Sequence, residues 1–197
     1  WDGVSAAVAD GADLNAQHDY SFMQSGFLEA LVRCAPLSVV KAMVEKGANV
    51  HAVSGTGVTA LHYASWYQPP HCEEGLAVVK YLMSKGADPE RRDKVGDIPV
   101  HDAAFNDNVP VLRYWMEEMK VDVNVTNKMG RTPLHYASDG TSLDATGYLV
   151  ICTDADLLIK NNVRLSVVPV ASLDFDRTVA PSASSSPTFF SVGQYCP

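Results

Sequence analysis

A short phrase recurs along this chain and limits what it can fold into. Residues 130–137 read Gly-Arg-Thr-Pro-Leu-His-Tyr-Ala, residues 59–64 read Thr-Ala-Leu-His-Tyr-Ala, and residues 98–103 carry a weaker copy, Ile-Pro-Val-His-Asp-Ala. A second phrase, Gly-Ala-Asp or a variant of it, starts at positions 11, 47, 86, 120 and 154, which are 36, 39, 34 and 34 residues apart. This period indicates a stack of similar units, each burying its apolar side only against its neighbours.

Together the two phrases resemble the ankyrin-repeat family, and the resemblance covers residues 1–171. It implies an all-α solenoid of stacked helix-turn-helix units with finger loops that resemble β-hairpins. We expect a partial unit at 1–10, full units at 11–46, 47–85, 86–119 and 120–153, and a degenerate unit at 154–171. Residues 172–197 form a Ser/Pro-rich tail, and its aromatic residues predict that part of it packs back on the array.

Each copy of the first phrase is predicted to start a helix. A threonine hydroxyl can accept an unpaired backbone N–H of the first turn, and proline at the first helical position has no N–H to leave unpaired. In the family the histidine of this phrase joins its loop to the next one, and His62, His101 and His135 hold that position. A shared zinc site is disfavoured, because units roughly 10 Å apart cannot bring three rings within ~2 Å of one ion.

Two units depart from the regular length. Unit 11–46 has an enlarged finger, and in unit 47–85 the distance from position 59 to position 86 is 27 residues, against 22 from position 132 to position 154. The additional residues lie at 66–74, where two successive prolines predict a loop. Helices are expected near 26–34, 37–46, 75–84 and 109–119.

Composition and charge disfavour several classes of protein. The chain is 47% hydrophobic and 19% charged, as in proteins with a packed core, and a formal net charge of −8 disfavours nucleic acid as a partner. No apolar run reaches the roughly 20 residues that span a bilayer, so no membrane association is expected. Four separated cysteines fit neither a metal knuckle nor a disulfide framework, which predicts reduced thiols in the cytoplasm or the nucleus. Because the chain opens on Trp1, within what reads as a repeat, we expect the natural protein to extend upstream.

No motif in the sequence predicts catalysis, a cofactor or a metal. The patterns Gly-x-Ser-x-Gly and His-Glu-x-x-His and the phosphate-binding loops are absent, and the Gly-x-Gly at 55–57 falls in a finger, where glycines form turns. His71 and Cys72 are neighbours in sequence, which rarely gives nucleophile and base the geometry that they need. We therefore expect a protein that is not an enzyme and holds no cofactor.

The chain is thus predicted to be a monomeric module that binds a protein or peptide partner. In the family the partner lies against the finger tips and the first helices, at residues that the fold does not require. Large aromatic residues, Met and Arg are enriched at binding hot spots, and for Phe105 a packing role between repeats is an equal alternative. Mapped by position, the candidate partner-binding residues are Val58, Trp66, Tyr67, Lys94, Asp97, Phe105, Met129 and Arg131.

Three further hypotheses stay open at this point. The array could be the regulatory or targeting region of a larger enzyme or channel, as the truncated start suggests. Residues 188–195 of the tail could occupy the groove and inhibit binding. The resemblance also implies a third: Asn15 and Asn124 hold the position at which some ankyrin arrays are hydroxylated.

Overall fold

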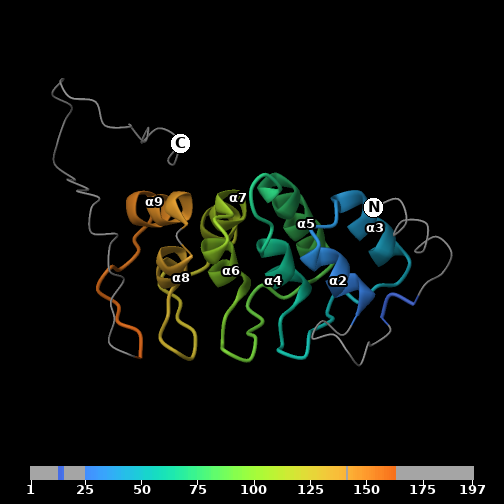
Figure 1. Ribbon diagram of the computed structural model, residues 1–197, viewed down its shortest axis with the longest axis horizontal. Coiled ribbons are helices and arrows are strands. Elements are labelled where there is room, and N and C mark those ends of the chain that lie inside the picture. Colours follow the sequence, from blue (N-terminus) through green and yellow to red (C-terminus); the bar gives the residue numbers. More distant parts are fainter. Residues whose placement is uncertain (1–12, 16–24, 141, 163–197) are drawn as a thin grey trace, which may run out of the picture.

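The computed structural model describes residues 13–15, 25–140 and 142–162, which form a row of helix pairs with loops projecting along one edge (Figure 1). The first helix of each pair, called an inner helix below, is α2 (Gly26–Val32), α4 (Ala60–Ser65), α6 (Pro99–Phe105) or α8 (Pro133–Asp139). The outer helices are α3 (Leu37–Glu45), α5 (Cys72–Ser84), α7 (Val109–Arg113) with its π-helical continuation η1 (Tyr114–Glu118), and α9 (Leu143–Cys152).

Helices of one kind pack against the same kind in the next pair, inner against inner and outer against outer. The part of the chain that the structure describes contains no strand, which confirms the predicted all-α solenoid. The expected helix at 1–10, the finger at 17–24 and the tail at 172–197 fall outside the described residues. The boundaries of the predicted units stay predictions.

The core lies between the helix pairs and follows the helical spacing of the sequence. The side chains with no exposed surface include Val78, Val79 and Leu82 in α5 and Val111 and Leu112 in α7. Burial of such an aliphatic side chain stabilises a fold by roughly 1.5–3 kcal/mol. Ala64, Ala103 and Ala137 of the inner helices are fully buried, and such small side chains let neighbouring helices pack closely.

The helix starts of α4 and α8 have the caps that the sequence predicts. Thr59 and Thr132 accept the backbone N–H of His62 and His135, each over 3.4 Å, and donate their own backbone N–H to the histidine Nδ1 over 3.2 Å. Because Nδ1 of His62 is an acceptor, Nε2 carries the proton and donates to the carbonyl of Asp97 in the next finger, 3.1 Å away. Burial lowers the pKa of His62, which keeps the ring neutral. The predicted loop-joining role is confirmed for His62.

Backbone hydrogen bonds close the fingers at 54–58, 93–97 and 127–131 and tie each of them to the finger that follows. The closing bonds run from Ser54 N to Val58 O (2.9 Å), from Asp93 N to Asp97 O (3.0 Å) and from Asn127 N to Arg131 O (3.0 Å). The bonds between fingers run from Lys94 N to Thr56 O (2.9 Å), from Lys128 N to Val95 O (3.1 Å) and from Asn162 N to Met129 O (2.9 Å). This ladder holds successive finger tips at a fixed spacing.

Gly96 shows why glycine is needed at a finger tip. Its φ is +89°, and a Cβ at this position would lie 2.8 Å from the backbone nitrogen of Lys128 in the next finger. Both the left-handed conformation and the close approach of two backbones therefore require a residue without a side chain.

Two outer helices differ from the sequence-based expectation. α5 starts at Cys72 instead of Gly75, because Glu73 and Glu74 form a first turn in which acidic side chains are favoured. Glu74 also accepts the backbone N–H of Leu37, a donor that the N-cap Pro36 cannot satisfy. The helix expected over 109–119 is regular only to Arg113 and then widens into η1.

The cysteines are only partly as expected. Cys34 and Cys72 carry free thiols, and burial raises the pKa of both, to about 11 for Cys72. Both are therefore protonated at neutral pH. Cys152 is disulfide-bonded, so the prediction of reduced thiols is wrong for this residue.

Candidate functional site

The candidate residues divide into an accessible and a buried group. Phe105 and Met129 have 46% and 43% of their surface exposed, and Lys94 is exposed at a finger tip. Trp66 and Arg131 are half-buried. Val58, Tyr67 and Asp97 are 8%, 0% and 6% exposed, so a partner cannot reach their side chains in this structure.

The assignment of Val58 to the binding surface is corrected because this residue closes its own finger. Its backbone carbonyl accepts the N–H of Ser54, and its N–H donates to the Ser54 hydroxyl over 3.1 Å. With both backbone groups paired across the hairpin, the side chain points into the core between the repeats.

Tyr67 is corrected for a different reason. It is fully buried, and its hydroxyl donates to the backbone carbonyl of Ala35 over 2.8 Å. The inserted loop thus turns inward directly after Trp66 and fastens its unit to the preceding one. Tyr67 holds the insertion in place and offers no surface to a partner.

Asp97 is a positioning residue inside the array. One carboxylate oxygen accepts a hydrogen bond from Nδ2 of Asn127 over 2.9 Å, and the other accepts one from the hydroxyl of Tyr136 over 2.6 Å. The carboxylate therefore links its own finger to the next finger and to helix α8. Its place in a finger suggested exposure, but these two donors turn it inward.

Three aromatic side chains follow one another across the inner helices. Trp66 ends α4, Phe105 ends α6, and Tyr136 lies on α8. The rings of Phe105 and Tyr136 meet edge to face at 6.2 Å, and the guanidinium of Arg131 lies 4.3 Å from the centre of the Tyr136 ring. We call Trp66, Asp102, Phe105, Tyr136 and Arg131 the inner strip.

Asp102 is a residue of the inner strip that sequence reasoning did not select. It is half-buried on α6, its Oδ2 is enclosed, and within the described residues this oxygen has no hydrogen-bond partner of normal geometry. The indole Nε1 of Trp66 is also enclosed without a hydrogen-bond partner of normal geometry. It lies close enough to the Asp102 carboxyl to act on it as a donor. Burial raises the pKa of Asp102 well above its usual range, which the Trp66 indole N–H partly offsets.

The sequence did contain a signal for Asp102. The three copies of the phrase read His-Tyr-Ala, His-Asp-Ala and His-Tyr-Ala, so Asp102 stands where the neighbouring units have Tyr63 and Tyr136. The carboxyl lies near enough to both rings that its charge contributes to raising the pKa of each tyrosine, although burial is the main cause. An acidic residue between two tyrosines is the unusual feature of this face.

Comparison with known proteins agrees with the helix pairs and fingers. A family model described as ankyrin repeats, in three copies, matches residues 71–161. Residues 71–161 are thus ankyrin repeats. Ankyrin repeats are in general a non-enzymatic fold for protein interaction.

The relatives of these ankyrin repeats are much longer proteins. The chain is 28% identical over 146 residues to Alpha-latrocrustotoxin-Lt1a of Latrodectus tredecimguttatus, a match that covers 74% of this chain and 10% of the toxin. It is 30% identical over 117 residues to a Transient receptor potential cation channel subfamily A member 1 homolog of Caenorhabditis elegans, covering 59% of this chain and 9% of the homolog. An Ankyrin repeat and LEM domain-containing protein 1 homolog of the same nematode is 33% identical over 70 residues, covering 36% of this chain and 9% of that homolog. The chain thus spans a tenth or less of the length of these relatives.

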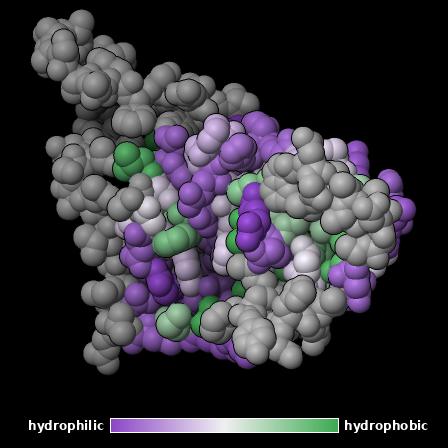
Figure 2. Space-filling view, turned by 45° about the vertical axis from the view of Figure 1, so that its right-hand side comes forward, coloured by the Kyte–Doolittle hydropathy of each residue, from purple (hydrophilic) through white to green (hydrophobic). Residues whose placement is uncertain are grey.

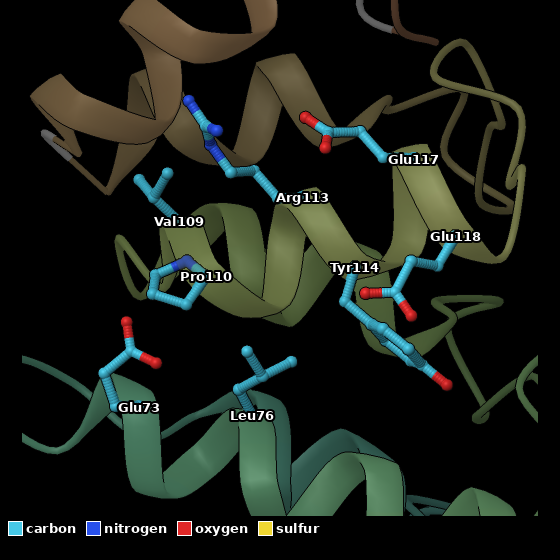
Figure 3. A pocket seen from close by; sticks show the side chains of 8 residues that line it. All are labelled: Glu73, Leu76, Val109, Pro110, Arg113, Tyr114, Glu117 and Glu118. Carbon is cyan, nitrogen blue, oxygen red and sulfur yellow. The ribbon is translucent and has the colours of Figure 1, made fainter. Parts of the chain in front are cut away.

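The ankyrin array also has a groove of about 390 Å³ between outer helices α5 and α7 (Figure 3). Three of its four charged groups have partners: Glu118 pairs with Lys80 at 2.9 Å, Glu117 accepts a hydrogen bond from the hydroxyl of Tyr148 at 3.0 Å, and Arg113 lies over the Tyr148 ring. The groove therefore offers little unsatisfied polar chemistry to a ligand.

The described part of the chain contains neither a cluster of metal-binding side chains nor a membrane-spanning helix. No three His, Cys, Asp or Glu side chains there come close enough together to hold a metal ion. None of the described helices is both long and apolar enough to cross a lipid bilayer. The side of the molecule in Figure 2 is mainly hydrophilic, with small separate hydrophobic patches.

Replacing Asp102 with asparagine is expected to stabilise the ankyrin array by about 1 to 3 kcal/mol near neutral pH. The pKa of this carboxyl is higher in the folded than in the unfolded protein, so ionisation costs stability once the pH exceeds the unfolded value of about 3.9. The cost grows until the pH passes the folded pKa. Urea unfolding followed by circular dichroism from pH 4 to pH 8 should show the difference between wild type and D102N increasing with pH.

The exposed Glu45 on outer helix α3 provides the control. Glu45→Gln removes the same charge from a solvated position, so its effect on unfolding should be small and nearly independent of pH. A difference between wild type and D102N that stays flat over this pH range would contradict the assignment of a buried, unpaired carboxyl.

Proposed function

We propose that this chain is a non-enzymatic interaction module that holds a protein or peptide partner against its inner helices and finger tips. The observation that carries the proposal is the exposure of Phe105 and Met129 beside a core that is complete without them. Aromatic side chains, Met and Arg that the fold leaves accessible are the types enriched at binding hot spots. The proposed contact residues are Trp66, Lys94, Phe105, Met129 and Arg131, with Asp102 and Tyr136 added from the structure.

The contact residues come from more than one unit, which supports a partner that lies across the array. The backbone bonds between fingers hold Lys94 and Met129 at a fixed separation, and the packing of α4, α6 and α8 does the same for the inner strip. A surface that is already ordered loses little conformational entropy when it binds. An extended peptide, or a loop or helix of a folded protein, would fit such a surface.

Alanine substitution of Trp66, Phe105, Met129 and Arg131 together is expected to abolish partner capture. The test is affinity capture from the native source, followed by mass spectrometry, with circular dichroism to confirm that the variant is folded. Because Trp66 is half-buried, a triple variant that keeps Trp66 and replaces only Phe105, Met129 and Arg131 should also be measured. The expected reduction is at least about tenfold for each variant, since hot-spot truncations cost about 2 kcal/mol or more.

A variant of the outer side serves as the matched control. Lys41→Ala with Glu45→Ala changes two exposed residues of helix α3 and should leave capture unchanged. Unimpaired capture by the folded inner-face variants would contradict the proposal. Loss of capture in the outer-side variant instead would move the binding surface to the outer helices.

A second candidate function is that of a regulatory or targeting region within a larger protein. The matches to the toxin and to the channel homolog cover only 10% and 9% of the lengths of those proteins, which favours this second function. The full-length reading frame tests this idea, which requires catalytic or membrane-spanning sequence beyond the array. Inhibition by residues 188–195, which lie outside the described part, and a monomeric state in the cytoplasm stay predictions.

A further inference from the structure

Asp102 is an acidic residue of the inner side whose carboxyl has no cation beside it within the described structure, and only the indole N–H of Trp66 acts on it as a donor. Glu29 pairs with Arg33, and Asp139 pairs with Arg131. Asp97 is satisfied by Asn127 and Tyr136.

The surroundings of Asp102 would increase its attraction for a positive charge. The charged groups that act on this carboxyl are Asp97 and Asp93, both acidic themselves. A buried carboxylate without a cation is costly, and a cation supplied from outside removes that cost. The formal charge of −8 on the whole chain acts in the same direction at longer range.

The side chains next to Asp102 favour an organic cation over a metal ion. Trp66 lies against the carboxyl, and the Tyr63 and Trp66 rings meet edge to face at 4.8 Å. Phe105 follows Asp102 by three residues on α6, so both lie on one side of that helix. Aromatic faces attract ammonium and guanidinium groups. A metal ion would need several oxygen ligands, whereas one unpaired carboxyl is present here.

We propose that the inner strip binds a lysine or arginine side chain of the partner, with its charge on the Asp102 carboxylate and its aliphatic stem against Trp66 and Phe105. This inference rests on the proposed function and adds the chemistry of the ligand: a partner segment with a basic residue at its centre. The indole N–H of Trp66 orients the carboxylate from the enclosed side. The affinity of the site for such a ligand increases with pH, because binding requires the ionised carboxyl.

The test uses an immobilised library of random ten-residue peptides and three forms of the full chain: wild type, D102N and the control E45Q. Wild type and E45Q should select peptides with Lys or Arg at one position. D102N should lose this preference, and its affinity for the selected peptides should fall at least about tenfold, because an interfacial charge pair has lost one member. Selection of peptides without a basic residue by wild type, in a manner sensitive to Phe105→Ala, would overturn the inference while the proposed function stands.

A small probe separates the two ideas if the library gives no binder. Nα-acetyl-arginine methylamide should shift the indole ¹⁵N–¹H resonance of Trp66, assigned with Trp66→Phe, in a saturable way that D102N weakens and 0.5 M NaCl reduces. The neutral analogue Nα-acetyl-norleucine methylamide should shift it much less. Equal shifts with the two probes, or no shift with either, would overturn the cation site. If no peptide of the library binds but the arginine probe gives a specific shift, the result would contradict peptide capture and leave the cation site standing.

Discussion

Tyr67→Ala is expected to lower the free energy of unfolding by about 3 to 5 kcal/mol, the usual cost of removing a buried aromatic side chain. The ring has no exposed surface and lies where the inserted loop meets the preceding repeat. Its removal leaves a cavity and takes away the hydrogen bond to the carbonyl of Ala35. Because each repeat is stabilised only by its neighbours, the loss should uncouple the two units that meet at this point. Urea unfolding followed by circular dichroism measures the effect.

Tyr67→Phe is the matched control, since it keeps the ring and removes only the hydroxyl. It should cost about 1 to 3 kcal/mol, because the Ala35 carbonyl is then left unpaired in the interior. A partner-binding role for Tyr67 would give the opposite pattern. Tyr67→Ala would then fold with unchanged stability and lose partner capture, and this result would contradict the structure.

Asp97→Ala is expected to destabilise the array by about 2 to 4 kcal/mol, because it removes the carboxylate that accepts from two donors at least partly buried between the repeats. These donors are Nδ2 of Asn127, 2.9 Å away, and the hydroxyl of Tyr136, 2.6 Å away. Burial, followed by hydrogen bonding to Asp97, raises the pKa of Tyr136, so the phenol stays protonated and keeps donating at physiological pH. The variant should therefore weaken the junction between the finger that contains Asp97 and helix α8.

A double-mutant cycle with Tyr136→Phe isolates this contact. If the phenol and the carboxylate interact as the structure shows, the double variant should be less destabilised than the sum of the two single variants. Additive effects would contradict a direct hydrogen bond. Lys94→Ala, which changes an exposed residue of the same finger, should alter unfolding by less than about 0.5 kcal/mol and shows whether the effect is specific to the buried network.

Much of the architecture followed from the repeated phrase, because its residues act locally. Thr59 and Thr132 cap the helices that they precede, Gly96 allows the finger to turn, and His62 reaches the next finger. Such contacts lie within a few residues or one repeat, so a regular period predicts them. The early start of α5 and the π-helical turn after α7 were not predicted. Neither acidic residues at a helix start nor the local widening of a helix changes the spacing of apolar residues in the sequence.

The candidate site was predicted less completely. Mapping by position correctly indicated that Met129 and Lys94 are accessible, and the structure shows that Phe105, for which packing between repeats was an equal alternative, is accessible too. Their role in binding stays a proposal. It was wrong about the accessibility of Val58, Tyr67 and Asp97. Position within a repeat gives the place of a backbone, whereas the direction of a side chain depends on which donors and cavities the neighbouring units present.

By itself the sequence determined that this chain stacks helix pairs and where each inner helix begins, because capping, turn formation and apolar spacing depend on neighbours in the chain. Only the tertiary structure decided which side chains of the inner side are exposed and which are buried. Asp97 accepts hydrogen bonds from donors 30 and 39 positions away, while Asp102, five residues after it, is left without a cation. The two carboxyls look alike in the sequence. Their difference arises from packing between repeats, which sets the hydrogen bonds and the burial of each one.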